Sequence, residues 1–189
     1  MTAMTCESLP IVTESRLALA VRGDETAFEE IVKAHESMVY SIAWHALRNT
    51  AVAEEIAQEV FLSLFRSLPA IEGEAHLIHW LRRSTSHRVI DYQRRNRLTA
   101  VSIEAAPDPA TDESGSDPWL EQRLRHLVGE LPTPQRLVVT LRFQEEMKPG
   151  EIASVLEMPV NTVKSHLRRA LSLLRERLES TMEGSNHAD

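Results

Sequence analysis

The 189-residue sequence is poor in the features that mark secreted, membrane and metal-binding proteins. Cys6 is the only cysteine, which excludes an internal disulfide and any zinc site built from several cysteines. No apolar run approaches the roughly 20 residues that a membrane-spanning helix needs. The N-terminus lacks the basic start and apolar core of a secretion signal. We therefore expect a soluble chain with a cytoplasmic location and no membrane span.

Motifs of catalysis are missing as well. The sequence has no Gly-rich phosphate loop, no nucleophile motif and no pair of carboxylates placed for acid–base catalysis. His76 and His79 lie three residues apart, but no carboxylate or third histidine is placed by sequence to complete a metal site. We therefore predict that the chain is not an enzyme and uses no cofactor, metal or small-molecule substrate.

Charge is abundant but is sorted along the chain. The formal net charge is −7, yet residues 80–98 hold six arginines against a single acid, Asp91. Residues 99–122 hold six acids and no base, and residues 160–178 hold five bases against one acid. Two basic segments separated by an acidic one predict two surfaces that bind a polyanion. The negative net charge, taken alone, would argue against such a partner.

Apolar periodicity predicts an all-α protein with no strands and no tandem repeat. Asp24 can cap a first helix, and a second helix begins near Thr50. A turn at residues 69–74 precedes a third helix over about 75–97. The second helix carries one apolar stripe, expected to face the core, which consists of Ile56, Ala57, Val60, Phe61, Leu64, Phe65 and Leu68.

The composition changes after the third helix. Pro107 and Pro109 stand among small and acidic residues, which predicts a flexible acidic linker over residues 99–117. The helices expected beyond it cover residues 119–131, 133–143, 149–156 and 160 to about 179. The sequence thus predicts two small helical domains joined by the linker: an N-terminal domain at 1–98, a C-terminal domain at 118–180, and a tail at 181–189.

Residues 151–174 have the spacing of a helix-turn-helix. Small Ala153 permits the two helices to cross closely, and Met158 and Pro159 lie in the turn. The outward face of the second helix is polar and basic, and consists of Asn161, Thr162, Lys164, Ser165, Arg168 and Arg169. Short polar side chains can meet base edges in a major groove while the basic ones meet phosphates. The alternative is an ordinary solvent-exposed face on a packed helix pair.

Three segments resemble bacterial sigma factors of the sigma-70 family, specifically the two-domain extracytoplasmic-function group. LPTPQRLVVTLRFQEEMKPGEIASVLEMPVNTVKSHLRRALSLLRERL resembles that group's promoter-binding C-terminal domain, region 4. AEEIAQEVFLSLFRSL resembles its polymerase-binding helix, and HLIHWLRRSTSHRVIDYQRRNR resembles the region 2 helix that melts the promoter. The resemblance follows the family's order from Phe28 to Leu178.

The resemblance implies a subunit that directs promoter-specific initiation. Core RNA polymerase would be bound by Glu54, Glu55, Gln58, Glu59 and Phe61. Minus-ten DNA would be bound by Trp80, Arg83, His87, Arg88, Asp91, Tyr92, Arg94 and Arg95. The minus-35 element of promoter DNA would be bound by the outward face of the helix-turn-helix. The linker would pass through the polymerase cleft, and an anti-sigma factor is an implied partner.

Several alternatives remain open. Trp80 and Tyr92 can be core residues rather than stacking surfaces for an unpaired base, and Asp91 can hold a neighbouring arginine in place. Residues 84–87 depart from the family's more apolar run, so a sigma-like protein that has lost promoter melting is one alternative. The others are a stand-alone helix-turn-helix activator that does not join core polymerase, and a helical enzyme.

Overall fold

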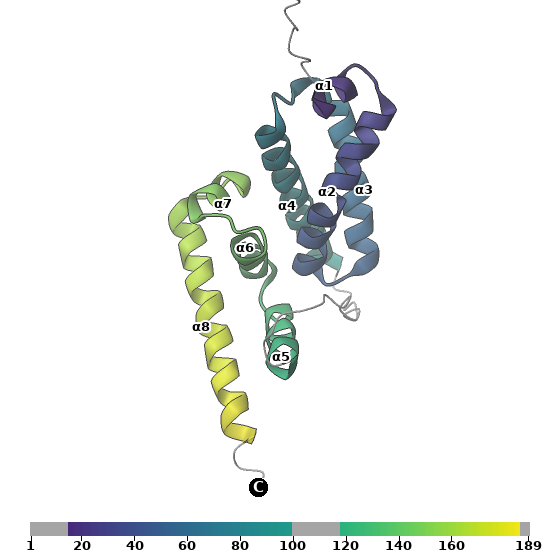
Figure 1. Ribbon diagram of the computed structural model, residues 1–189. Coiled ribbons are helices and arrows are strands. Elements are labelled where there is room, and N and C mark those ends of the chain that lie inside the picture. Colours follow the sequence, from purple (N-terminus) through teal and green to yellow (C-terminus); the bar gives the residue numbers. More distant parts are fainter. Residues whose placement is uncertain (1–14, 100–117, 186–189) are drawn as a thin grey trace, which may run out of the picture.

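The computed structural model describes residues 15–99 and 118–185, which are helical and contain no strand (Figure 1). The predicted all-α fold class is confirmed. None of the helices in these two ranges has the length and apolar character needed to cross a membrane. The helices are α1 (Arg16–Val21), α2 (Glu25–Leu47), α3 (Thr50–Ser67), α4 (Glu74–Thr99), α5 (Pro118–Gly129), α6 (Thr133–Phe143), α7 (Pro149–Val155) and α8 (Val160–Ser185).

Most helix ends follow local sequence signals. The side chain of Asp24 accepts a hydrogen bond from the backbone N–H of Ala27 at 3.1 Å, which caps α2 as predicted. Asn49 caps α3 in the same way. The sequence did not predict α1 or the 3-10 turn over Leu68–Ala70, because such short elements show no complete apolar period. Helix α8 extends beyond its predicted end near residue 179.

Helices α2, α3 and α4 pack around a common core, and α1 covers one end of α2 (Figure 1). Ile42, Leu64 and Leu81, one from each of the three helices, are completely buried. The prediction that Phe65 faces this core is wrong, because its side chain is 56% exposed. Phe65 lies at the flank of α3, where its ring meets that of Phe28 edge to face at 5.2 Å.

Helices α7 and α8 form the predicted helix-turn-helix. Ile152 and Ala153 of α7 are buried in the same apolar cluster as Val163 of α8, while Ala170 of α8 is buried in a second cluster with Leu127 and Leu131. Glu157 adopts a left-handed conformation (φ 51°) in the turn between the helices. This allows the chain to reverse direction within the four residues that separate the two helices.

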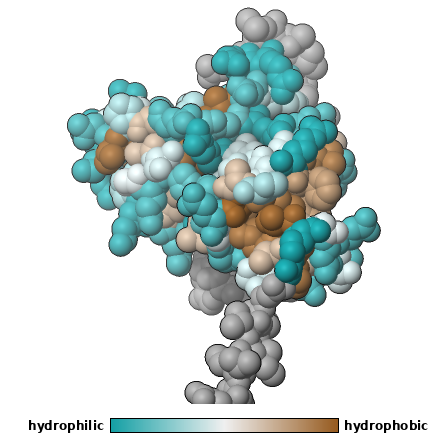
Figure 2. Space-filling view, turned by 90° about the horizontal axis from the view of Figure 1, so that it is seen from above, coloured by the Kyte–Doolittle hydropathy of each residue, from teal (hydrophilic) through white to brown (hydrophobic). Residues whose placement is uncertain are grey.

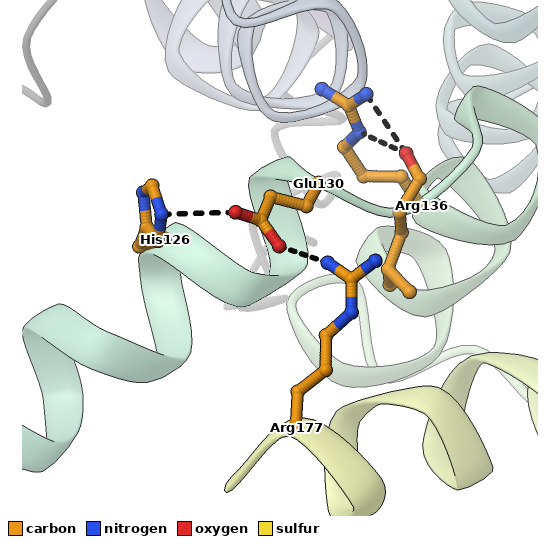
Figure 3. A network of polar contacts seen from close by, with 5 residues as sticks. His126, Glu130, Arg136 and Arg177 are labelled. Atoms are coloured by element: carbon orange, nitrogen blue, oxygen red, sulfur yellow. Dashed lines mark hydrogen bonds and ion pairs between the residues drawn. The ribbon is translucent and has the colours of Figure 1, made fainter. Parts of the chain in front are cut away.

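Polar contacts fix the end of α5 to its neighbours (Figure 3). Glu130, which directly follows α5, pairs with His126 on that helix and with Arg177 on α8. Arg136 of α6 donates two hydrogen bonds to the carbonyl of Leu131, at 3.0 and 3.3 Å. Burial lowers the pKa of Arg136 to about 10, and the charge of Arg48 adds to this shift. α5 is thereby attached to both α6 and α8.

The C-terminal helices pack against the N-terminal ones. α6 contacts α2 and α4, and α7 contacts α4 (Figure 1). Buried residues from both ranges form one continuous apolar cluster, which includes Ile42 of α2, Leu81 of α4, Leu141 of α6 and Ile152 of α7. The predicted linker at 99–117 lies outside the described residues except for Thr99, which is the last residue of α4. The sequence alone did not predict that the C-terminal helices pack on the N-terminal ones.

Replacing Leu141 with alanine is expected to lower the free energy of unfolding by about 2–5 kcal/mol, because the side chain is fully buried where the two parts meet. Chemical denaturation followed by circular dichroism measures the change. Leu62→Ala is the matched control, since that side chain is 60% exposed and should shift stability by only about 0.5 kcal/mol. Equal losses in the two variants would contradict the shared core.

Candidate functional site

The outer face of α3 is acidic, as predicted for a protein-binding surface. Glu54, Glu55, Gln58 and Glu59 are all exposed. A groove of about 550 Å³ lies between α2 and α3, and Glu54, Gln58 and Phe61 line it, whereas Glu55 and Glu59 line a hollow on the α4 side. Phe61 was expected to add an apolar anchor to this surface, but it is only 9% exposed and belongs to the apolar core. The groove nonetheless gives the carboxylates an apolar border.

Other apolar side chains are exposed on the N-terminal helices, namely Val21, Leu62 and Phe65. Seen from the end of the molecule at which α1 lies, the surface shows a compact apolar area surrounded by polar side chains (Figure 2). The exposure of Phe65 was missed because this residue shares the apolar stripe of α3, whereas Leu62 lies outside that stripe and no sequence signal singled it out. Grouped apolar side chains on a surface are typical of protein contacts.

One side of α4 faces α3. Arg88 pairs with Glu59 and donates a further hydrogen bond to Ser63. A predicted DNA-binding residue is therefore paired with a predicted polymerase-binding one. Farther along α4, Asp91 lies 3.0 Å from the guanidinium of Arg94, and its carbonyl accepts a hydrogen bond from Arg95. The alternative that Asp91 holds a neighbouring arginine is confirmed.

The opposite side of α4 faces the helix-turn-helix. Arg83 and His87, both predicted to contact DNA, approach Glu157 in the turn between α7 and α8. Arg82 pairs with Glu145, which follows α6, at 2.9 Å. Sequence analysis missed Arg82, Glu145 and Glu157 as contact residues. No sequence signal links them, because the partners lie more than 60 residues apart.

Trp80 and Tyr92 are partly buried and pack against the apolar cluster. This packing supports the alternative that both residues serve the core, although neither is fully buried. Within the unusual segment at 84–87, Thr85 is completely buried and its hydroxyl donates to the carbonyl of Leu81 at 2.8 Å. This intrahelical bond lets a polar residue occupy a core position of α4.

The predicted DNA-facing side of α8 lies in its first three turns and is open to solvent. Its members Asn161, Thr162, Lys164, Arg168 and Arg169 are exposed, and Ser165 is partly exposed. Because successive positions on one helix face lie three or four residues apart, these side chains form a single strip. The strip is short, polar and basic, which suits insertion in a DNA major groove.

The two histidines considered for metal binding have separate partners. His76 accepts a hydrogen bond from the backbone N–H of Glu72 at 3.2 Å, and His79 pairs with Ser154 at 3.1 Å. In the described ranges, no three histidine, cysteine, aspartate or glutamate side chains gather where they could hold a metal ion.

Comparison with known proteins identifies the family. Residues 31–99 match Sigma-70 region 2, and residues 121–174 match Sigma-70, region 4. RNA polymerase sigma-E factor of Streptomyces avermitilis is 30% identical over 158 residues, which cover 84% of this chain and 88% of that relative. The chain belongs to the sigma-70 family. This sigma factor is also 25% identical over 184 residues to the ECF RNA polymerase sigma factor SigW of Bacillus subtilis, covering 90% and 98% of the two chains.

Solved structures agree on the fold of this sigma factor. CnrH, in complex with the cytosolic domain of CnrY, matches 87% of this chain and 96% of its own with a TM-score of 0.61 at 22% identity. RpoE of Bartonella quintana, in complex with the anti-sigma factor NepR, matches 80% and 96% with a TM-score of 0.67 at 19% identity. Region 2 corresponds to α2–α4 here, and region 4 to α5–α8.

Proposed function

We propose that this sigma factor directs promoter-specific transcription initiation by joining core RNA polymerase through α3 and promoter DNA through α4 and α8. The observation that carries the proposal is the separation of three charged surfaces on a region 2 and region 4 fold. Carboxylates gather on the outer face of α3, guanidiniums on α4, and short polar and basic side chains at the start of α8. The polymerase supplies the catalysis, in the cytoplasm.

The outer face of α3 suits a basic helical partner. Exposed Glu54 and Glu55 can pair with arginines or lysines, and the groove beside them can accept an apolar side chain. A partner that paired with the carboxylates and also inserted an apolar side chain in the groove would have its ion pairs at the edge of the contact. In this proposal that partner is core RNA polymerase.

The basic side chains of α4 suit the melted minus-ten element. Guanidinium groups neutralise phosphates, and the accessible parts of Trp80 and Tyr92 can stack on an unpaired base. Asp91 serves this surface indirectly, because it forms an exposed ion pair with Arg94. Duplex DNA of the minus-35 element would instead receive the first three turns of α8 in its major groove.

An anti-sigma factor belongs to the proposal as a regulatory partner. RpoE of Bartonella quintana, which shares this fold, was solved in complex with such a factor. A protein that covered α3 or α4 would keep this sigma factor from polymerase and DNA.

The proposal is tested by run-off transcription. Core RNA polymerase supplemented with this protein should produce discrete RNA 5′ ends on fragmented genomic DNA that core polymerase alone does not produce. The stand-alone activator is the alternative outcome: the protein would bind DNA, yet it would give no new 5′ ends and would not associate with core polymerase. That result would overturn the proposal.

A further inference from the structure

We infer that a hollow between the region 2 and region 4 helices binds a fatty carboxylate, with the apolar tail packed on α5, α6 and α8 and the carboxylate held by arginines. The hollow has a volume of about 370 Å³ and lies where the C-terminal end of α2 meets these three helices (Figure 1). Pockets for small molecules commonly have about 300–1,000 Å³ and often lie between domains. Such a ligand is neither polymerase nor DNA, so the site goes beyond the proposed function.

The walls of this interdomain hollow are largely apolar. They consist of Leu124 and Val128 of α5, Val139 and Phe143 of α6, and Leu171 and Leu174 of α8. The side chains of Leu124, Phe143 and Leu171 are 41%, 56% and 48% exposed. Large apolar side chains that gather in a concave place and stay exposed are typical of a binding site, and a hydrocarbon tail would remove them from water.

The polar part of the lining is cationic. Arg48, the residue that ends α2, and Arg125 of α5 contribute guanidiniums, and His45 contributes an imidazole. None of the described residues that line the hollow is acidic. The whole chain has a net charge of −7, so a lining with two guanidiniums and no carboxylate is a local exception that attracts anions. Together with the apolar walls, this charge selects an amphipathic anion.

Arg48 is held in place before a ligand binds. Its backbone is left-handed (φ 58°), and its N–H donates to the carbonyl of Trp44 at 2.6 Å. Its guanidinium lies over the ring of Trp44, 4.2 Å from the centroid. Stacking uses the face of a guanidinium, whereas a carboxylate is bound by the N–H groups at its edge. A group that is ordered in advance loses less entropy when the ligand binds.

The arginines near this hollow also repel one another. Burial lowers the pKa of Arg136, and the charge of Arg48 lowers it further. A carboxylate bound beside Arg48 would offset this repulsion between cations.

Other ligands and other hollows fit less well. A phosphate monoester carries nearly two negative charges at pH 7, and desolvating them in a mostly apolar hollow costs more than desolvating the single charge of a carboxylate. The groove between α2 and α3 is also apolar, but Glu36 and Glu54 line it and would repel an anion. A hollow between α5 and α8 shares Leu124, Leu171 and Leu174 with the interdomain hollow, so it can accept the end of a longer tail.

Isothermal titration of the full-length chain with decanoate, kept below micelle-forming concentrations, tests the site. One decanoate should bind per chain with a dissociation constant below about 0.1 mM. The unfolding temperature should rise with the decanoate concentration, because the ligand binds only the folded state. Decyltrimethylammonium, which has the same tail and a cationic head, should bind at least about tenfold more weakly than decanoate. Decyl phosphate should also bind more weakly.

Two variants locate the carboxylate of the ligand. Gln144→Glu places a negative charge in the lining at an exposed position without changing the size of the side chain. Decanoate affinity should fall by at least about tenfold, because the new carboxylate pairs with the cations of the hollow and repels the ligand. Arg48→Asn should weaken binding by about tenfold as well, and asparagine tolerates the left-handed backbone at this position.

The matched control is Gln58→Glu, which makes the same change in the groove between α2 and α3. It should bind decanoate as the native chain does, and an equal loss there would overturn the assignment to the interdomain hollow. Thermal unfolding without ligand identifies any variant that has lost its fold. Absence of one-site binding to the native chain, equal affinity for the cationic analogue, or native affinity in a folded Gln144→Glu variant would overturn the inference. Tighter binding of decyl phosphate than of decanoate would overturn the choice of a carboxylate.

Discussion

Reversing Glu55 and Glu59 to lysine is expected to abolish co-purification of this protein with core RNA polymerase. Both side chains are exposed on α3, and both line the hollow between α3 and α4. Two ammonium groups there would repel a basic partner where two carboxylates attract it. We expect affinity to fall by at least about 100-fold, or ~2.7 kcal/mol, in a pull-down titrated with core enzyme.

The matched control is Glu30→Lys/Glu146→Lys, which makes the same change in net charge at exposed positions away from α3. It should bind polymerase as the native protein does. Because Glu59 also pairs with Arg88, thermal unfolding of the reversal variant must be compared with that of the native protein. Native-like stability with unchanged polymerase binding would exclude α3 as the contact surface.

Two arginine substitutions are expected to separate duplex binding from promoter melting. Arg168→Ala should weaken binding of closed promoter duplex by about tenfold, because Arg168 lies exposed on the DNA-facing strip of α8. The slope of the logarithm of the binding constant against the logarithm of the salt concentration should become shallower by about one, since one phosphate contact is lost. Arg94→Ala should leave that affinity nearly unchanged but reduce the permanganate reactivity of melted thymines in the complex with polymerase.

Arg66→Ala is the control, since it removes an exposed arginine from the end of α3, outside both proposed DNA surfaces. It should affect neither measurement. If Arg168→Ala and Arg94→Ala weakened closed-duplex binding to the same extent, the assignment of α4 to melted DNA and α8 to duplex would fail.

Local features of the fold were largely predictable from sequence. The cap at Asp24, the start of α6 at Thr133 and the turn containing Pro159 are each determined by neighbouring residues. The strip on α8 was predictable for the same reason, since helical period alone fixes which side chains share a face. Membership of the sigma-70 family, suggested by three segments in the correct order, is confirmed.

Features that depend on distant parts of the chain were not predictable. Phe65 has the spacing of a core residue, but it contacts Phe28 of α2 only at the edge of the helix pair and stays 56% exposed. Arg82 and Glu145 pair only because α6 and α7 pack on α4, and nothing in either local segment specifies that packing. The assignment of individual residues to polymerase or DNA remains a prediction.

Helix α8 is continuous over 26 residues, about 39 Å at the rise of an α-helix. Its first turns carry the strip proposed for DNA, whereas Arg177 near the other end is paired with Glu130, the residue that follows α5. An unbroken helix tilts as a whole, so displacement of α5 by another protein would change the angle at which the distant strip enters a groove. Promoter recognition could thus be altered from a position that never touches DNA.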